Sequence, residues 1–166
     1  MITKTSLLAI RALLCLAKDK QGVATSPRSI ALQLGESQAY MAKVLRSLVR
    51  AGILRAERGS RGGVLLNRRP DEITLLAIVE ACQGAIVGSY CENSVDPGTT
   101  CAFHQAASEL RQSIVTVLTR WTLEQFARSP RPTHRLPGNA HCMMANAAVP
   151  IEWSSKESRK KRSSRR

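Results

Sequence analysis

The sequence predicts a mainly α-helical protein that carries one short β-hairpin. Apolar residues recur every three or four positions in several segments, which is typical of amphipathic helices. Two such segments, residues 26–35 and 37–52, are separated by about three residues around Gly35. Two short apolar runs with a tip rich in glycine and arginine follow at once, over residues 53–66. This order predicts a helix-turn-helix followed by a wing, an architecture that binds DNA.

The ends of the two central helices are marked by capping residues. Ser26 is the expected N-cap of the first helix and Pro27 its first residue, a favoured pairing, and Gly35 ends it. Ser37 is the expected N-cap of the second helix, which Gly52 ends. The apolar positions of the second helix recur at helical spacing: Tyr40, Met41, Val44, Leu45, Leu48 and Val49.

Four further helices are expected around this unit. The first covers residues 4–18, and another begins after its cap Thr74 and ends at Gly84. A long helix is expected over residues 102–120, and Thr122 begins a capping box that opens a last short helix. The long helix carries one apolar stripe: Ala106, Leu110, Ile114, Val117 and Leu118. A stripe of this length needs a covering surface; the family resemblance given below implies that this surface is a second copy of the helix, which makes it a dimerisation helix.

The hairpin is expected to form from two strands, residues 53–57 and 63–66, joined by a basic tip at residues 58–62. A surface hairpin without a nucleic-acid role is the alternative, but a basic tip lies where a wing requires it.

The chain divides into four expected parts: a winged-helix DNA-binding domain over residues 1–83, a cysteine-containing loop over 84–101, the dimerisation helix with the terminal short helix over 102–128, and an irregular basic tail over 129–166.

Three segments carry a resemblance to a known family. They are the opening helix around residues 5–17, the run from Leu45 to Leu54 with Gly52 near its end, and the Arg-Gly-x-x-Gly-Gly motif that starts at Arg58. Together they resemble the IscR/NsrR-type (Rrf-type) winged-helix regulators over about residues 2–128. The resemblance implies a dimeric, sequence-specific transcriptional regulator, expected to be a repressor, that binds operator DNA. Val64 stands where the family motif has an aromatic residue.

Candidate DNA-reading residues lie at the start of the second central helix, where a recognition helix contacts base edges. They are Ser37, Gln38, Tyr40 and Lys43. A glutamine can pair with adenine, and a lysine can reach guanine or phosphate. Ser37 has helix capping as an equal alternative role.

The wing tip adds Arg58, Ser60 and Arg61, because arginine enters narrow minor grooves of negative potential. The resemblance assigns the minor-groove role to Arg58. It also places an acidic residue where this chain has Ala42, so no operator sequence can be carried over.

Cys91 and Cys101 flank the loop before the long helix, and His104 follows on its first turn. The resemblance implies a [2Fe–2S] cluster on these three residues, although the middle cysteine of the family loop is absent. Three hypotheses stay open: a cluster sensor, a Cys91–Cys101 disulfide switch, and a loop without sensing chemistry. A fourth ligand has several candidates: Glu92, Asp96, His141 and Cys142.

The chain has 166 residues and a formal net charge of +13. The last eleven residues hold seven basic residues and one acidic residue, so residues 1–155 retain +7. This charge suits a polyanion such as DNA, and non-specific nucleic-acid binding is therefore an alternative function. No nucleotide-binding loop or nucleophile–base pair indicates an enzyme. No apolar run has the length of a membrane span, and no signal peptide is recognised, so a cytoplasmic location is expected.

Overall fold

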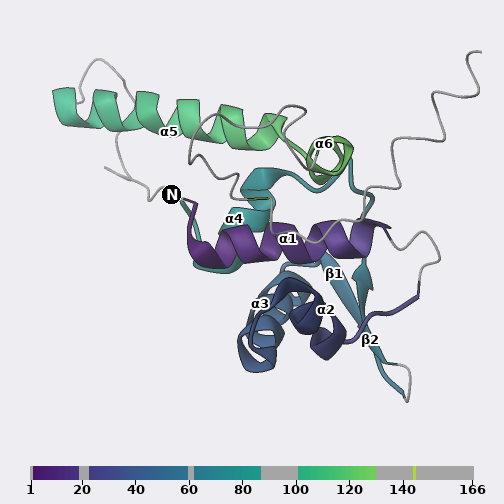
Figure 1. Cartoon of the computed structure of the whole chain (residues 1–166). Coiled ribbons are helices and arrows are strands. Elements are labelled where there is room, and N and C mark those ends of the chain that lie inside the picture. The colour runs from purple at the N-terminus through teal and green to yellow at the C-terminus, as the bar shows by residue number, and fades with distance from the viewer. Residues whose placement is uncertain (1, 19–22, 60–61, 87–100, 130–143, 145–166) are drawn as a thin grey trace, which may run out of the picture.

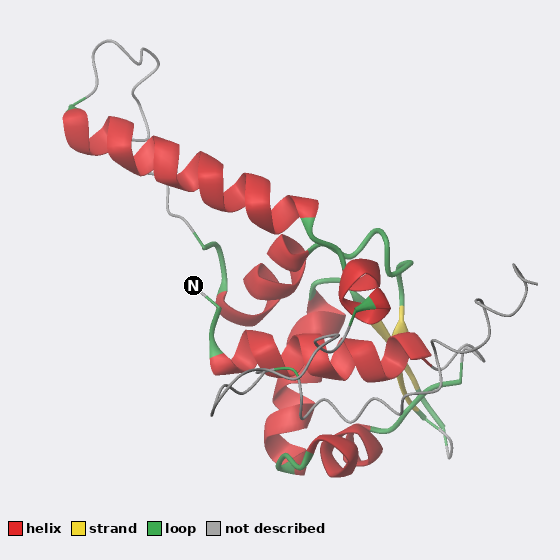
Figure 2. Cartoon of the chain, turned by 45° about the horizontal axis from the view of Figure 1, so that its top comes forward, coloured by secondary structure: helices red, strands yellow, loops and turns green. Residues whose placement is uncertain are grey.

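The structure is a computed structural model that describes residues 2–18, 23–59, 62–86, 101–129 and 144. The helices of the described residues are α1 (Lys4–Lys18), α2 (Pro27–Leu34), α3 (Gln38–Arg50), α4 (Leu75–Gln83), α5 (Ala102–Arg120) and α6 (Leu123–Arg128). Helix α1 lies across the middle of the molecule, with α2 and α3 on one side and α4, α5 and α6 on the other (Figure 1). Figure 2 shows α5 extending well beyond the other helices at one end. The predicted fold, a mainly helical winged helix-turn-helix, is confirmed.

The predicted N-caps close the helices with hydrogen bonds. Ser26 Oγ accepts from Ser29 N at 3.1 Å, and Thr74 Oγ1 accepts from Ala77 N at 3.2 Å. Gly35 ends α2 with a left-handed φ of 68°, which glycine adopts without the steric cost of a Cβ. These local contacts fix where α2 and α4 begin and where α2 ends.

The hairpin consists of β1 (Leu54–Glu57) and β2 (Gly63–Leu66), paired antiparallel. Buried Leu54 lies opposite half-buried Leu66, and both pack against the hydrophobic core, so this end of the hairpin meets the helical body. The strand was predicted to begin at Ile53, but the structure begins β1 one residue later. Ile53 is nevertheless held by the backbone, because its carbonyl accepts from Asn67 N at 3.0 Å.

One hydrophobic core joins the helices. It includes Leu13 of α1, Met41 of α3 and Ile78 of α4, each fully buried. Leu118 near the end of α5 and Leu123 of α6 belong to the same core. The C-terminal end of α5 is therefore anchored on the winged-helix body, whereas its N-terminal part extends away from that body (Figure 1).

The predicted apolar stripe of α5 is covered only in part by the protein's own core. Ile114 packs against the core of its own chain, and Leu118 is buried. Leu110 and Val117 are 61% and 47% exposed, and Phe103, which the predicted stripe omitted, is 69% exposed. The spacing of seven residues places these three on one flank of the helix. The exposed stripe is thus Phe103, Leu110 and Val117.

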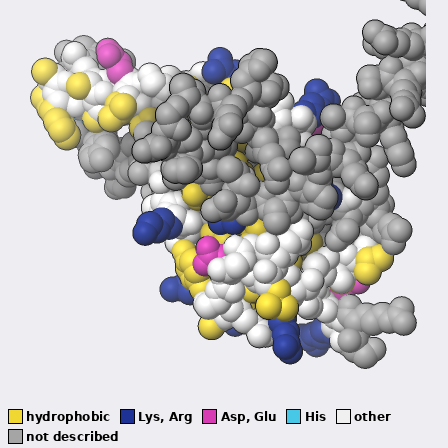
Figure 3. Space-filling model, viewed as in Figure 1, with side chains coloured by type: hydrophobic (Ala, Val, Ile, Leu, Met, Phe, Trp, Pro, Cys, Tyr) yellow, Lys and Arg dark blue, Asp and Glu magenta, His cyan; other side chains and the backbone are white. Residues whose placement is uncertain are grey.

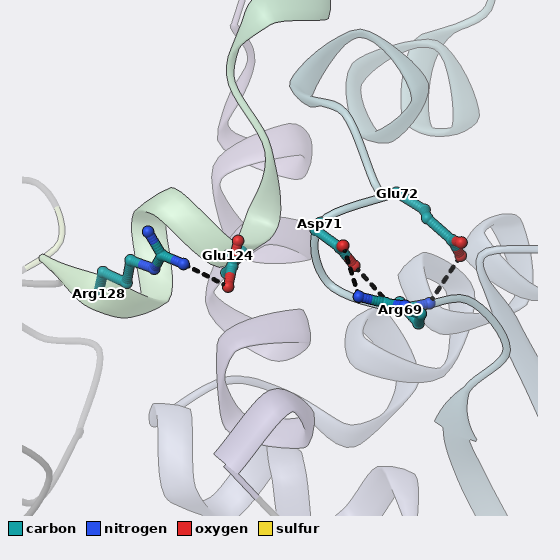
Figure 4. A network of polar contacts seen from close by, with 5 residues as sticks. All are labelled: Arg69, Asp71, Glu72, Glu124 and Arg128. Atoms are coloured by element: carbon teal, nitrogen blue, oxygen red, sulfur yellow. Dashed lines mark hydrogen bonds and ion pairs between the residues drawn. The ribbon is translucent and has the colours of Figure 1, made fainter.

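A polar turn at residues 69–72 precedes α4, and Figure 4 shows it together with the ion pair between Glu124 and Arg128 of α6. The Arg69 guanidinium donates two hydrogen bonds to the carboxylate of Asp71, and Arg69 N donates to Glu72 Oε2. Glu124 N donates to Pro70 O at 3.1 Å, which ties the start of α6 to this turn. Each ion pair lies within one segment, Arg69–Asp71 in the turn and Glu124–Arg128 in α6, so backbone hydrogen bonds rather than these charges join the two segments.

Candidate nucleic-acid interface

The exposed face of α3 is basic. Met41, Val44, Leu45 and Leu48 are buried against the body, whereas Lys43, Arg46 and Arg50 are exposed. Spacings of three and four residues place the three cations on one stripe of the helix. Gln38, in the first turn, is exposed as well. None of the three cations forms an ion pair with any residue that the structure describes, which leaves their charge available to a polyanion.

Ser37 and Tyr40 have roles inside the protein. Ser37 Oγ accepts from Tyr40 N at 3.2 Å, so the predicted capping role is confirmed. Tyr40 is half-buried against the core, and its hydroxyl forms a 2.9 Å hydrogen bond with Thr5 Oγ1 of α1. The packing role expected from its spacing is therefore present, and DNA contact by either residue stays a prediction.

The wing places Arg58 directly after β1, with its side chain exposed. The tip turns tightly, since Gly62 N donates to Gly59 O at 2.9 Å and Gly59 has a φ of 120°. Ser60 and Arg61, the other predicted wing contacts, lie outside the described residues. Arg55 lies 3.6 Å from Glu57 within β1, but both side chains are about half exposed, so solvent screens this pair.

Sequence reasoning assigned no site role to Arg11, yet the structure places it under the helix-turn-helix. Its side chain is 12% exposed, and Arg11 Nη2 donates to Leu34 O, the last residue of α2, at 3.4 Å. Arg11 Nη1 also lies 4.0 Å from Glu36 Oε1 in the turn between α2 and α3. The available signal was an arginine within an otherwise apolar helix. A cation there interacts favourably with the negative, C-terminal end of the α2 dipole and stabilises the turn between α2 and α3.

Basic side chains gather at one end of the molecule and apolar side chains on the projecting part of α5, although both kinds also occur elsewhere on the surface. Figure 3 shows Lys and Arg side chains at the end formed by α2, α3 and the hairpin, and hydrophobic side chains on the projecting part of α5. The basic end can bind a polyanion, and the apolar end can bury its stripe against another protein surface.

Two of the three predicted cluster ligands lie in the described part of the chain. Cys101 is exposed at the N-cap position of α5, and His104 follows on the first turn. His104 Nδ1 is buried and has no hydrogen-bond partner among the described residues. Cys91 lies outside the described residues. Within those residues no group of three or more metal-binding side chains occurs, so the described donors do not complete a cluster site.

The remaining described cysteines are packed inside the protein. Cys15 is buried in α1, and Cys82 packs against the core from α4. Burial raises the pKa of the Cys82 thiol from about 9 to about 11. Because the thiolate is the reactive form, Cys82 is poorly suited to redox or metal chemistry near neutral pH. No helix among the described residues has the length and apolar character needed to cross a membrane.

Comparisons with solved structures extend the fold assignment. A protein from Listeria innocua is 26% identical, with a TM-score of 0.64 over 86% of this chain and 96% of that one. The oxidized form of CymR from Staphylococcus aureus is 25% identical, with a TM-score of 0.60 over 80% and 99%. IscR from T. potens, at 23% identity and a TM-score of 0.61 over 83% and 93%, shares the fold.

A family model described as the Rrf2 iron-dependent transcriptional regulators matches residues 2–129. The match covers α1, the helix-turn-helix, the hairpin and α4 to α6, and so includes both the basic end and the projecting helix. The chain therefore belongs to the Rrf2 family of transcriptional regulators.

Proposed function

We propose that this regulator binds specific operator DNA as a homodimer and acts as a repressor. The observation that carries the proposal is the exposed basic stripe of α3, Lys43, Arg46 and Arg50, on the helix expected to enter the major groove. Gln38 and Lys43 near the start of α3 read bases, and Arg46 and Arg50 contact phosphates. Arg58 on the wing reaches the neighbouring minor groove.

The homodimer is proposed from the apolar stripe of α5. Phe103, Leu110 and Val117 are exposed on one flank of a helix that extends beyond its own core. A seven-residue repeat suits pairing with an antiparallel or parallel copy of the same helix. Two recognition helices presented by a dimer would contact two half-sites, which gives more contacts than one winged helix has alone.

We also propose that a sensor in the cysteine-containing loop controls DNA binding, through one of two kinds of sensor chemistry. The family description as iron-dependent favours an iron–sulfur cluster held by Cys91, Cys101 and His104 with a fourth ligand. The oxidized state of S. aureus CymR favours a thiol switch in which Cys91 and Cys101 form a disulfide. In both forms Cys101 acts at the N-terminus of α5. Because α5 is the proposed dimerisation helix, a chemical change at Cys101 would affect that helix directly.

Two measurements distinguish these forms. Anaerobically purified full-length protein with a visible absorption band and stoichiometric iron and sulfide would support the cluster. Colourless, iron-free protein that loses two thiols on mild oxidation, and none in a Cys101→Ala variant, would support the disulfide. Colourless protein with no thiol loss would leave the segment without a sensing role.

The DNA-binding proposal is tested by substitution on the α3 stripe. Lys43→Ala is expected to lower operator affinity, because it removes a base or phosphate contact. Arg111→Ala is the matched control, since Arg111 is an exposed cation on α5, at the opposite end of the molecule from α3 (Figure 1). Equal operator affinities for the two variants in a fluorescence-anisotropy titration at fixed salt would contradict the assignment of α3.

A further inference from the structure

The wing is fastened to the helix-turn-helix by a short backbone pairing that is remote in sequence. Thr25 N donates to Val64 O and Val64 N donates to Thr25 O, both at 2.9 Å. Thr25 immediately precedes Ser26, the N-cap of α2. The segment entering α2 therefore adds one antiparallel bridge to the free edge of β2, where the two lie side by side (Figure 1).

This close approach depends on Gly63. A Cβ at position 63 would lie 2.5 Å from both the carbonyl carbon and oxygen of Thr25, and 3.0 Å from Ser26 N. These atoms belong to the backbone at the start of α2, so they cannot rotate away as a side-chain end would. The requirement is for space, because Gly63 is not among the glycines with positive φ.

The neighbouring Gly62 has a different role. A Cβ there would lie 2.7 Å from Glu57 O and 2.9 Å from Gly59 O, both within the hairpin. Gly62 therefore permits the tight turn of the tip, whereas Gly63 permits contact between the hairpin and the segment before α2. Gly63, the last glycine of the Arg-Gly-x-x-Gly-Gly motif, thus faces the helix-turn-helix.

We infer that Gly63 is a positioning residue, which sets the location of the wing relative to the recognition helix through the Thr25–Val64 bridge. Ser26 fixes the start of α2, and α2 packs against α3, so the bridge holds the hairpin and α3 as one unit. Arg58 at the end of β1 would then meet the minor groove at a fixed distance from the groove that α3 occupies. This inference rests on the proposed DNA-binding function.

A double-mutant cycle on operator binding tests the inference, since coupled residues give non-additive effects. The protein is the full chain, and the variants are Gly63→Ala, Arg58→Ala and their combination. Each single change is expected to weaken operator binding about 5- to 150-fold, the range of one good specific contact. The double variant is expected to bind operator as well as whichever single variant binds it less tightly. The reason is that a displaced wing no longer uses Arg58.

Lys43→Ala separates a positioning role from general damage. It should weaken binding by the same factor in the Gly63→Ala background as in the wild type, because α3 keeps its place. Unaltered affinity of folded Gly63→Ala, or fold-changes for Gly63→Ala and Arg58→Ala that multiply, would overturn the inference. Wild type that binds no operator would instead overturn the proposed function. An Arg58→Ala change without effect in the wild type would refute the wing contact, and the inference with it.

A second variant covers the case in which Gly63→Ala does not fold, as judged by circular dichroism. Thr25→Pro leaves Gly63 in place and removes the donor of one of the two bridge hydrogen bonds. In the Thr25→Pro background, Arg58→Ala is expected to weaken operator binding by less than half the factor by which it weakens binding in the wild type. Full wild-type dependence on Arg58 in a folded Thr25→Pro protein would overturn the inference.

Discussion

The exposed stripe of α5 gives the sharpest prediction about assembly. Leu110 leaves 61% of its surface exposed and lies between Phe103 and Val117 on the same flank. Complete burial of a leucine side chain is worth about 1.5–3 kcal/mol, so covering the exposed part contributes about 1–2 kcal/mol per protomer. A two-fold axis uses the residue twice, which gives about 2–4 kcal/mol per dimer.

Leu110→Glu should therefore dissociate the dimer. It removes this contribution and places a carboxylate without a partner in the seam, which adds a further cost. The dissociation constant of the dimer should rise by at least about 30- to 1000-fold. Ile114 is a poor test position, because it packs against the core of its own chain and a charge there would disturb folding.

Sedimentation equilibrium at several protein concentrations measures the effect. Gln112→Glu is the matched control, because Gln112 is exposed on the far side of the same helix and the change introduces the same charge. Leu110→Glu should be monomeric where the wild type and Gln112→Glu are dimeric, with unchanged helix content by circular dichroism. A Leu110→Glu protein as dimeric as the control would refute the seam, and so would a monomeric wild type.

Three other predictions concern DNA contact and thiol chemistry. Arg58→Ala should weaken operator binding by about 1–3 kcal/mol in a gel-shift titration at fixed salt, and unchanged affinity would remove Arg58 from the interface. Deletion of residues 156–166, which hold seven basic residues, should lower non-specific affinity and reduce the salt slope while preserving sequence preference; lost discrimination between operator and random DNA would show a larger role for the tail. Cys82, whose pKa is raised to about 11, should be alkylated more slowly than Cys101 at pH 8, and its burial should stabilise the fold fully below about pH 9 and progressively less as pH rises toward 11. Equal alkylation rates, resolved by mass spectrometry of the modified peptides, would show that Cys82 is not protected.

The helices and the hairpin were predictable because their signals are local. Ser26, Ser37 and Thr74 each cap the helix that follows them through a backbone N–H three residues away. The basic face of α3 was predictable for the same reason, since a 3.6-residue period separates buried Met41 from exposed Lys43.

The contacts that join these elements were not predictable from the sequence. Thr25 meets Val64 across 39 positions, and Tyr40 meets Thr5 across 35. No local pattern encodes such pairs, because they arise only when helices and hairpin pack. Periodicity also predicted the apolar positions of α5, but it did not show which of them pack against the core of the same chain. Ile114 and Leu118 pack within the protein, whereas Leu110 and Val117 are exposed.

Selection of binding sites from random double-stranded DNA by the full chain tests the central claim most directly. A dimeric winged-helix regulator should enrich one two-fold-symmetric sequence, with half-sites about one helical turn apart. Its enrichment should fall sharply when the selection is repeated with Lys43→Ala and remain unchanged with Arg111→Ala. Recovery of no preferred sequence, with binding that depends only on salt concentration, would contradict the account and indicate a general polyanion-binding protein.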